Sequence, residues 1–176
     1  MSVVDSYHAY VFGTSFWYAL RGIMRIINPR AVVGWFRPPV DSLLEANDLE
    51  LYTTWTDGFG LLTLAGLLLV LCDAVALPQS LVGSAFTVPG SERSKKPYAR
   101  AVIVLTMFHH VTTGIGAFMH WVQPSHHTIA MDIGVYGNIV LTVMGVLALN
   151  SKGLEDEAGV AAKKVTHVVS SPRKVR

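Results

Sequence analysis

Four stretches of mostly apolar residues recur along the chain, and they constrain its fold more than any other feature. A helix that crosses a bilayer needs about 20 such residues, because each residue adds about 1.5 Å of rise. We therefore predict an all-α fold, a four-transmembrane-helix bundle in up-down-up-down order. The predicted helices cover residues 9 to 28, 52 to 77, 99 to 121 and 128 to 149.

The composition agrees with a lipid environment and excludes several classes of protein. Hydrophobic residues make up 51% of the chain and charged residues 15%, which is too apolar for an ordinary soluble domain. The Lys and Arg residues are spread in short groups, so the dense basic face of a nucleic-acid binder is missing and we expect no nucleic-acid partner. Cys72 is the single cysteine, which excludes an internal disulfide and a cysteine-based zinc site.

The segments between the predicted helices differ in character. The first helix should end at Asn28-Pro29, and the aromatic, basic stretch "RAVVGWFRPP" that follows suits a short interfacial segment in the headgroup region. The loop "VQPSHH" is short enough to make the last two helices an antiparallel hairpin. We expect residues 1–150 to form the transmembrane domain and residues 151–176 a polar, disordered cytosolic tail.

Positive charge near the helices predicts the orientation in the membrane. Most Lys and Arg residues lie in the linker between the second and third helices and in the tail, whereas the opposite side carries Arg30 and Arg37. The positive-inside rule therefore places both termini in the cytosol. The terminal "RKVR" loosely resembles an endoplasmic-reticulum retrieval signal, which suggests that membrane as the location.

Charged side chains stand inside the first two predicted helices, at ends that share one side of the membrane. Arg21 and Arg25 occupy the last two turns of the first helix, and Asp57 lies in the first turns of the second. An unpaired charge in hydrocarbon costs several kcal/mol, so such groups usually pair or face the bundle interior. We predict that Arg21 or Arg25 pairs with Asp57. Two simpler readings stay open: arginines that extend to the headgroups, and an aspartate with a purely structural role.

Histidines interrupt the third predicted helix. His109, Thr113 and His120 fall within about 40° of one helical face, while His110 points about 100° away. The fourth predicted helix brings Asp132 and Asn138 to the same side of the membrane as His120. We expect these polar groups to meet those of the first two helices in one recess near one leaflet.

A metal centre is the less favoured interpretation of the histidines. His109 and His120 lie about 16 Å apart along a helix, so they cannot bind the same ion. His120, His126 and His127 could converge through the short loop, with Asp132 as a further ligand, and this small site stays open. We predict no metal and no cofactor.

The favoured function is a polar intramembrane pocket for a lipophilic small molecule, which could be the site of an acid/base enzyme. Burial disfavours the charged form of each group, and this lets a general acid and a general base coexist near neutral pH. Isomerisation, cyclisation and cofactor-free oxygenation all fit, and whether the chain is an enzyme stays open. The candidate catalytic residues are Asp57, His109, His120 and Asp132. The candidate binding residues are Arg21, Arg25, Trp55, Thr113, Tyr136 and Asn138.

The alternative function is a non-catalytic membrane scaffold or assembly factor that tethers other membrane-bound biosynthetic enzymes. Its intramembrane polar residues would hold the helices together, and its basic tail would contact partners or anionic lipid. Transport is less favoured, since four helices would need to oligomerise to enclose a path and no pair of broken helices is visible.

Three short motifs resemble the DoxX-like family of small four-helix membrane proteins, in particular its uncharacterised branch. They are "NPR" at residues 28–30, "VVGWF" at residues 32–36 and "WTDGFG" at residues 55–60. The resemblance covers roughly residues 9 to 150 and implies a four-helix bundle with no catalytic residues to carry over. The long "VPGSERSKK" linker departs from the compact second loop of that family. In size and helix number the chain also resembles a fungal ergosterol-biosynthesis scaffold and membrane proteins of fungal natural-product pathways, which implies a place in lipid or secondary-metabolite biosynthesis.

Overall fold

The computed structural model describes residues 6–41, 44–72 and 96–150, and this part of the chain is all-helical. The described residues do not include the predicted tail, which begins at residue 151. They also leave out Asp73 and the linker between the second and third long helices. A short 3₁₀ turn, η1, covers Pro39–Asp41. The helices are α1 (Ser6–Ile27), α2 (Pro29–Phe36), α3 (Asp48–Leu71), α5 (Lys96–Trp121) and α6 (Ile129–Leu149).

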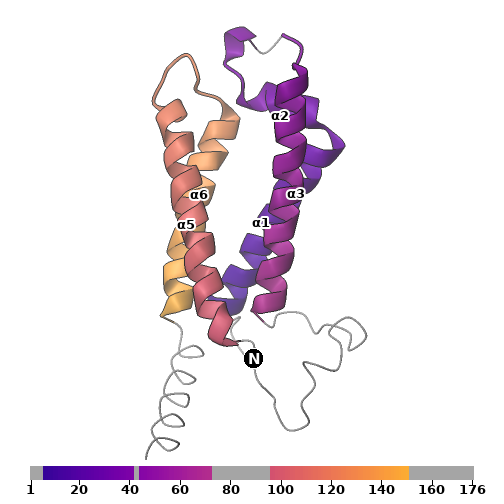
Figure 1. The fold of residues 1–176 in the computed structure, drawn as a ribbon. Coiled ribbons are helices and arrows are strands. Elements are labelled where there is room, and N and C mark those ends of the chain that lie inside the picture. The colour runs from indigo at the N-terminus through magenta and orange to yellow at the C-terminus, as the bar shows by residue number, and fades with distance from the viewer. Residues whose placement is uncertain (1–5, 42–43, 73–95, 151–176) are drawn as a thin grey trace, which may run out of the picture.

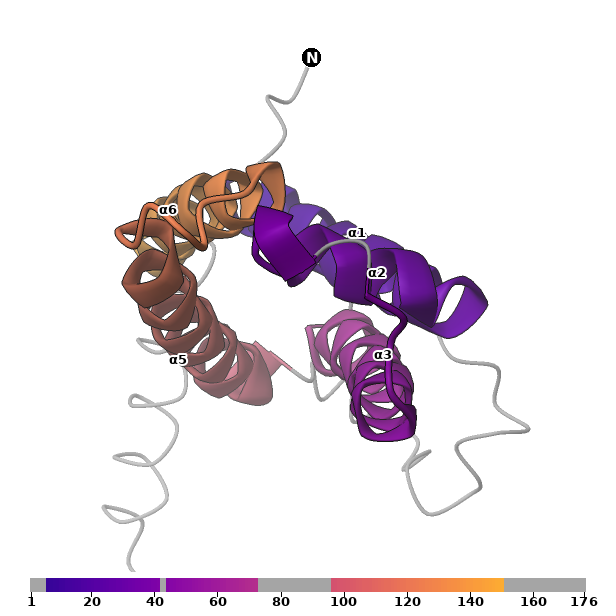
Figure 2. The same cartoon turned by 90° about the horizontal axis from the view of Figure 1, so that it is seen from above.

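The four long helices run side by side in two pairs, α1 with α3 and α5 with α6 (Figure 1). Contacts between α1 and α6 join the two pairs, whereas α3 and α5 touch each other much less. Seen from above, the helices follow one another in the order α3, α1, α6, α5 (Figure 2). α1 is therefore the helix through which one pair contacts the other.

Three of the described helices are long and apolar enough to cross a membrane. They are α3, residues Tyr98–Trp121 of α5, and α6. By length and composition the chain is thus a multi-pass membrane protein. The predicted first span, α1, is not in this group, because two arginines and several Ser, Thr and Tyr residues lower its hydropathy.

The observed helix ends follow local capping. α3 begins at Asp48, before the predicted residue 52, because the side chain of Asn47 accepts from the backbone N–H of Glu50 while that of Glu50 accepts from the backbone N–H of Asn47. The predicted interfacial segment contains a helix, α2. Its N-cap is Asn28, whose Oδ1 accepts from the backbone N–H of Ala31 at 3.1 Å, and Pro29 fills the first helical position.

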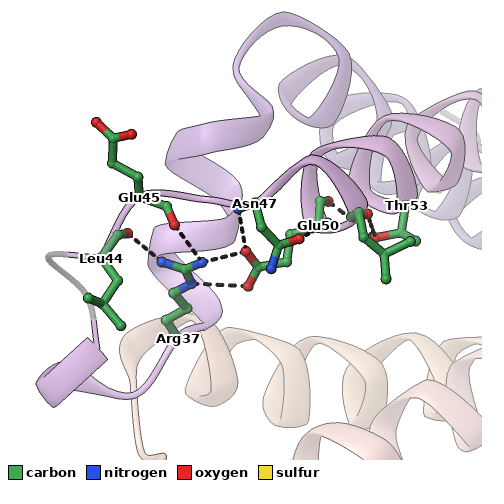
Figure 3. Close-up of polar contacts among 7 residues, drawn as sticks. Arg37, Leu44, Glu45, Asn47, Glu50 and Thr53 are labelled. Carbon is green, nitrogen blue, oxygen red and sulfur yellow. Dashed lines mark hydrogen bonds and ion pairs between the residues drawn. The ribbon is translucent and has the colours of Figure 1, made fainter.

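The side chain of Arg37 fixes the connection between α2 and α3 (Figure 3). Its guanidinium donates to both carboxylate oxygens of Glu50, with Nε 3.1 Å from Oε1, and to the backbone carbonyls of Leu44 and Glu45. Glu50 also belongs to the N-terminal capping box of α3, so a single arginine ties the loop to the start of that helix. Charge-assisted, two-pronged contacts of this kind are the strong ones among hydrogen bonds.

At the end of the bundle where α1 begins, tyrosine hydroxyls join α1 to the other helices. Tyr7 donates to the backbone carbonyl of Cys72 at 2.6 Å, and the hydroxyl of Tyr10 lies 2.7 Å from that of Thr106. The fully buried side chains of Leu68 and Ile103 surround these contacts. This end of the bundle is a packed core with satisfied polar groups.

Farther along, α1 and α3 approach each other through two glycines. A β-carbon placed on Gly22 would lie 2.8 Å from the carbonyl oxygen of Gly58, and one placed on Gly58 would lie 3.0 Å from that of Gly22. Neither position can carry a side chain without moving the helices apart. Because lipid gives helices no hydrophobic reason to associate, close packing over small residues is a main source of their contact.

Candidate functional site

A buried hydrogen-bond chain crosses the middle of the bundle from α1 through α5 to α6. The imidazole of His110 is fully buried, with Nδ1 3.1 Å from Oδ1 of Asn138 and Nε2 3.4 Å from the hydroxyl of Tyr18. An amide oxygen only accepts, so Nδ1 of His110 carries the proton and Nε2 accepts from Tyr18. The rings of Tyr18 and His110 also stack at 5.2 Å. His110 therefore holds three helices together as a neutral imidazole.

Two predicted binding residues belong to this chain. The hydroxyl of Thr113 donates to Oδ1 of Asn138 at 3.2 Å, and the amide of Asn138 donates to the carbonyl of Gly134 at 2.6 Å. A β-carbon on Gly114 would lie 3.2 Å from that of Asn138, so glycine at this position is what admits the asparagine. Thr113 and Asn138 are thus brought together, with their polar atoms used inside the protein.

The predicted ion pair between α1 and α3 is confirmed. Nε of Arg25 lies 2.6 Å from Oδ2 of Asp57, where the arginine side chain is 10% exposed and the carboxylate 54%. The same guanidinium donates from Nη1 to the carbonyl of Arg21 at 3.2 Å and lies 5.7 Å from the ring centre of Phe36. Arg25 is consequently neutralised by a carboxylate of the neighbouring helix.

Arg21 has no such partner. Among the described residues it forms no ion pair and its guanidinium makes no hydrogen bond, and its Nη1 is shielded from solvent. The guanidinium lies 5.8 Å from the ring centre of Trp17, one turn earlier in α1. The Arg21 side chain therefore points toward the start of α1, away from the nearer helix end at Ile27. An arginine that extends to the headgroups would point the other way.

His109 lies beside this unpaired charge. Its Nε2 is also shielded and has no hydrogen-bond partner among the described residues. The ring meets that of Tyr18 edge to face at 5.3 Å, and the histidine interacts electrostatically with Arg21 and Asp57. Two shielded nitrogen atoms without partners thus belong to residues near Tyr18: Arg21 stands about one turn later in α1, and His109 of α5 is in ring contact with the tyrosine. We call Trp17, Tyr18, Arg21 and His109 the polar recess.

A shallow, mostly apolar groove of about 330 Å³ opens between α1 and α6, next to the recess. Its floor is formed by two glycines, Gly13 and Gly137, and its walls include Phe16, Trp17 and Tyr136. Trp17 belongs to both the groove and the recess, and its indole Nε1 is a third shielded nitrogen without a partner in the described residues. The predicted binding residue Tyr136 is 59% exposed and lines this groove.

The remaining predicted site residues lie elsewhere. Asp132 accepts from the indole of Trp121 at 2.7 Å and lies 2.9 Å from Nε2 of His127, which makes a separate polar group at the turn between α5 and α6. His120 is exposed, with Nδ1 3.0 Å from the carbonyl of Gly116 in its own helix. Trp55 is 49% exposed and packs edge to face on Phe59.

The predicted site residues of the four helices do not form one hydrogen-bonded cluster in the described residues. Their contacts divide the predicted residues into an ion pair, a buried chain and a loop group, and among them only Arg21 and His109 have shielded nitrogen atoms without partners in the described residues. The histidine metal site left open by the sequence finds no support, since no three His, Cys, Asp or Glu side chains in the described ranges are grouped to hold an ion.

Sequence reasoning missed Trp17, Tyr18 and His110. A usable signal was present, because Tyr10, Thr14 and Tyr18 recur at intervals of four residues and mark the interior face of α1. All three are fully buried, and Trp17 stands one turn before Arg21 on the adjacent face. His110 was missed because the helical angle between it and His109 can be calculated from the sequence, whereas the position of α6 beside that face cannot.

Comparison with known proteins identifies a family without an assigned activity. No curated protein and no solved structure matches the chain. The DoxX-like resemblance stays a prediction that no match tests. A family model described as "Domain of unknown function (DUF8792)" matches residues 10–159, which include nearly all of the described helices, and the chain belongs to this family.

Proposed function

We propose that the chain spans the membrane four times, up-down-up-down, with both termini in the cytosol. The 22 residues of α1 extend about 33 Å, enough to cross a bilayer, and α1 lies along α3 and α6, which are apolar enough to cross. Most of its polar side chains are buried and contact α3 or α5, so lipid need not solvate them. Epitope tags at the two termini should both be digested by protease added to the cytosolic face of sealed membranes. Protection of one tag and not the other would exclude an even number of crossings.

We further propose that the polar recess binds a lipophilic small molecule in the membrane. The observation that carries this proposal is the pair of shielded nitrogen atoms without partners, Nη1 of Arg21 and Nε2 of His109. Buried polar atoms are nearly always hydrogen-bonded, and an exception calls for a partner such as a ligand or a water molecule. The open groove beside Trp17 offers apolar walls and access from the bilayer.

An acid/base reaction is the chemistry that such a pocket supports best. His109 would take up a proton from the bound molecule, and Arg21 would stabilise the negative charge that this leaves. Asp57 already pairs with Arg25, so it would act on the recess through its charge and would hold α1 in place. Isomerisation and cyclisation need only these proton transfers, whereas oxygenation needs dioxygen as a second substrate. A place in lipid or natural-product biosynthesis at the endoplasmic reticulum belongs to the same proposal.

The test compares two histidines of the same helix. His109→Ala should abolish formation of the product, or binding of the ligand, at unchanged abundance of the membrane protein. His120→Ala is the matched control, because His120 is exposed and bonds only to its own helix. Both variants are expressed in the native host, and the extractable metabolites and the protein level are measured together. A metabolite profile that follows protein abundance in both variants would reject a functional role for His109.

A non-catalytic scaffold that tethers biosynthetic enzymes is the second candidate, and one observation favours it. Three pairs of charged or polar side chains bind each other within the chain and need no ligand. They are Arg25 with Asp57, Arg37 with Glu50 and His127 with Asp132. A scaffold predicts that every substitution lowers the phenotype only in proportion to the loss of protein. Affinity purification of the tagged chain from detergent extracts should then recover the same membrane enzymes with His109→Ala as with the unchanged protein.

A further inference from the structure

The charges around the polar recess do not balance. α1 contributes two guanidinium groups, Arg21 and Arg25, whereas Asp57 is the carboxylate that pairs with one of them. Of the other carboxylates in the described part of the chain, Asp132 and Glu50 pair with His127 and Arg37, and Asp41, Glu45 and Asp48 lie in η1, in the loop and at the start of α3, without an ion pair to Arg21. One positive charge is therefore left over beside His109, partly covered by protein.

An unpaired cation at such a place is expensive in a membrane, and the conformation of Arg21 does not relieve the cost. Its guanidinium lies over the ring of Trp17, toward the middle of α1, although a turn in the other direction would bring it nearer to the headgroups. The contact with the indole face stabilises the cation by less than the cost of leaving a charge unpaired in hydrocarbon. The missing stabilisation is that of an anion.

The groove indicates what is attached to that anion. Trp17 forms part of its wall, and the guanidinium carbon of Arg21 lies 5.8 Å from the ring centre of Trp17, so this one side chain connects the groove with the positive charge. The volume of about 330 Å³ is at the low end for ligand pockets, which usually measure about 300 to 1,000 Å³. A ligand with a single tail fits this volume better than a phospholipid with two.

We infer that the ligand of the polar recess is an amphipathic organic monoanion with one hydrocarbon tail, of the long-chain carboxylate class. Its carboxylate pairs with the guanidinium of Arg21 on the side of His109, and its tail lies over Gly13 and Gly137 between α1 and α6. This inference rests on the proposed binding function and names the chemical class of the ligand.

The experiment measures equilibrium binding of two probes to the purified full chain in nanodiscs of phosphatidylcholine, a lipid without net charge. Radiolabelled palmitate carries the carboxylate, and hexadecanol has the same chain length without charge. We expect saturable binding of palmitate, with a markedly weaker affinity for hexadecanol. Arg21→Gln should weaken palmitate binding by at least about tenfold, because a hydrogen bond to a charged group contributes that factor or more. Arg21→Lys, which keeps the charge, should retain part of the affinity.

Two controls separate the outcomes. Arg30→Gln removes an exposed arginine of α2 and should leave palmitate binding unchanged. Gly137→Leu fills the groove and should weaken the binding of both probes.

Equal, saturable binding of palmitate and hexadecanol would overturn the inference about charge while the binding function stands. No saturable binding of either probe would reject both. Competition by added phosphatidylglycerol as strong as by palmitate would instead indicate a phospholipid headgroup site and overturn the single-tailed ligand.

Discussion

The guanidinium of Arg25 reaches the carboxylate of Asp57 across the point where α1 and α3 come closest, at 2.6 Å between Nε and Oδ2. The backbones touch there at Gly22 and Gly58, three residues before the arginine and one after the aspartate. The ion pair and the glycine contact therefore depend on each other, since a wider separation of the helices would break both.

Removal of one charge of this pair should destabilise the protein. Asp57→Asn leaves Arg25 without its carboxylate, and we expect a loss of about 1 to 2 kcal/mol, below the cost for a fully buried pair because Asp57 is 54% exposed. The double substitution Arg25→Gln with Asp57→Asn should recover part of the loss. Unfolding in detergent micelles of the unchanged protein, of each single variant and of the double variant gives the four free energies that the comparison needs. Glu45→Gln, at an exposed carboxylate, is the control. Additive effects of the two single substitutions would show that the pair is not coupled.

Two glycines of α3 should respond to alanine with opposite signs. A β-carbon on Gly58 would come within 3.0 Å of the backbone of α1, so Gly58→Ala should push the helices apart and lower the melting temperature. Gly60 has open space around its α-carbon, and Gly60→Ala should be neutral or stabilise the helix by about 0.5 to 1 kcal/mol. Thermal unfolding of both variants makes the comparison. Equal melting temperatures would mean that α1 and α3 are not in close contact.

Adjacent histidines of α5 should have different roles. His110→Ala removes the acceptor of Tyr18 and a donor to Asn138 and leaves a cavity between three helices, so we expect a loss of roughly 2 to 4 kcal/mol. His109→Ala removes no hydrogen bond of its side chain within the described chain and should cost much less stability while it abolishes ligand binding. The readouts are the melting temperature and the binding of palmitate. If His109→Ala destabilised as much as His110→Ala, a structural role for His109 would explain its position.

Arg37 should control the connection between α2 and α3. Arg37→Gln removes the contacts to Glu50 and to the carbonyls of Leu44 and Glu45, and residues 38–47 should then exchange amide hydrogens faster. Hydrogen exchange followed by mass spectrometry measures this segment directly. Arg30→Gln is the matched control on the same helix. Unchanged exchange in residues 38–47 would indicate that the loop is held by lipid or by backbone contacts alone.

The sequence predicted what depends on one helix at a time. Hydropathy predicted most ends of the long helices to within a few residues, and the step at Asn28-Pro29 predicted the end of the first, but α3 ends at Leu71, well before the predicted residue 77. The ion pair of Asp57 was predictable because two arginines and this aspartate lie at the same depth of the predicted membrane, where opposite charges have to pair. The interior role of His110 was not predictable, because the angle of a side chain around its helix does not show which neighbouring helix it faces. The group of Asp132 with His127 depends on the conformation of a short loop, which hydropathy does not describe.

The polar character of α1 bears on how the chain is inserted. α1 leaves the ribosome before the other helices, yet its arginines and interior tyrosines make it the long helix least soluble in lipid. Its partners for those groups, Asp57 on α3 and Thr106 and His110 on α5, are translated only later. Under the proposed four-span topology, the first helix therefore becomes stable in the membrane only after α3 and α5 have been made.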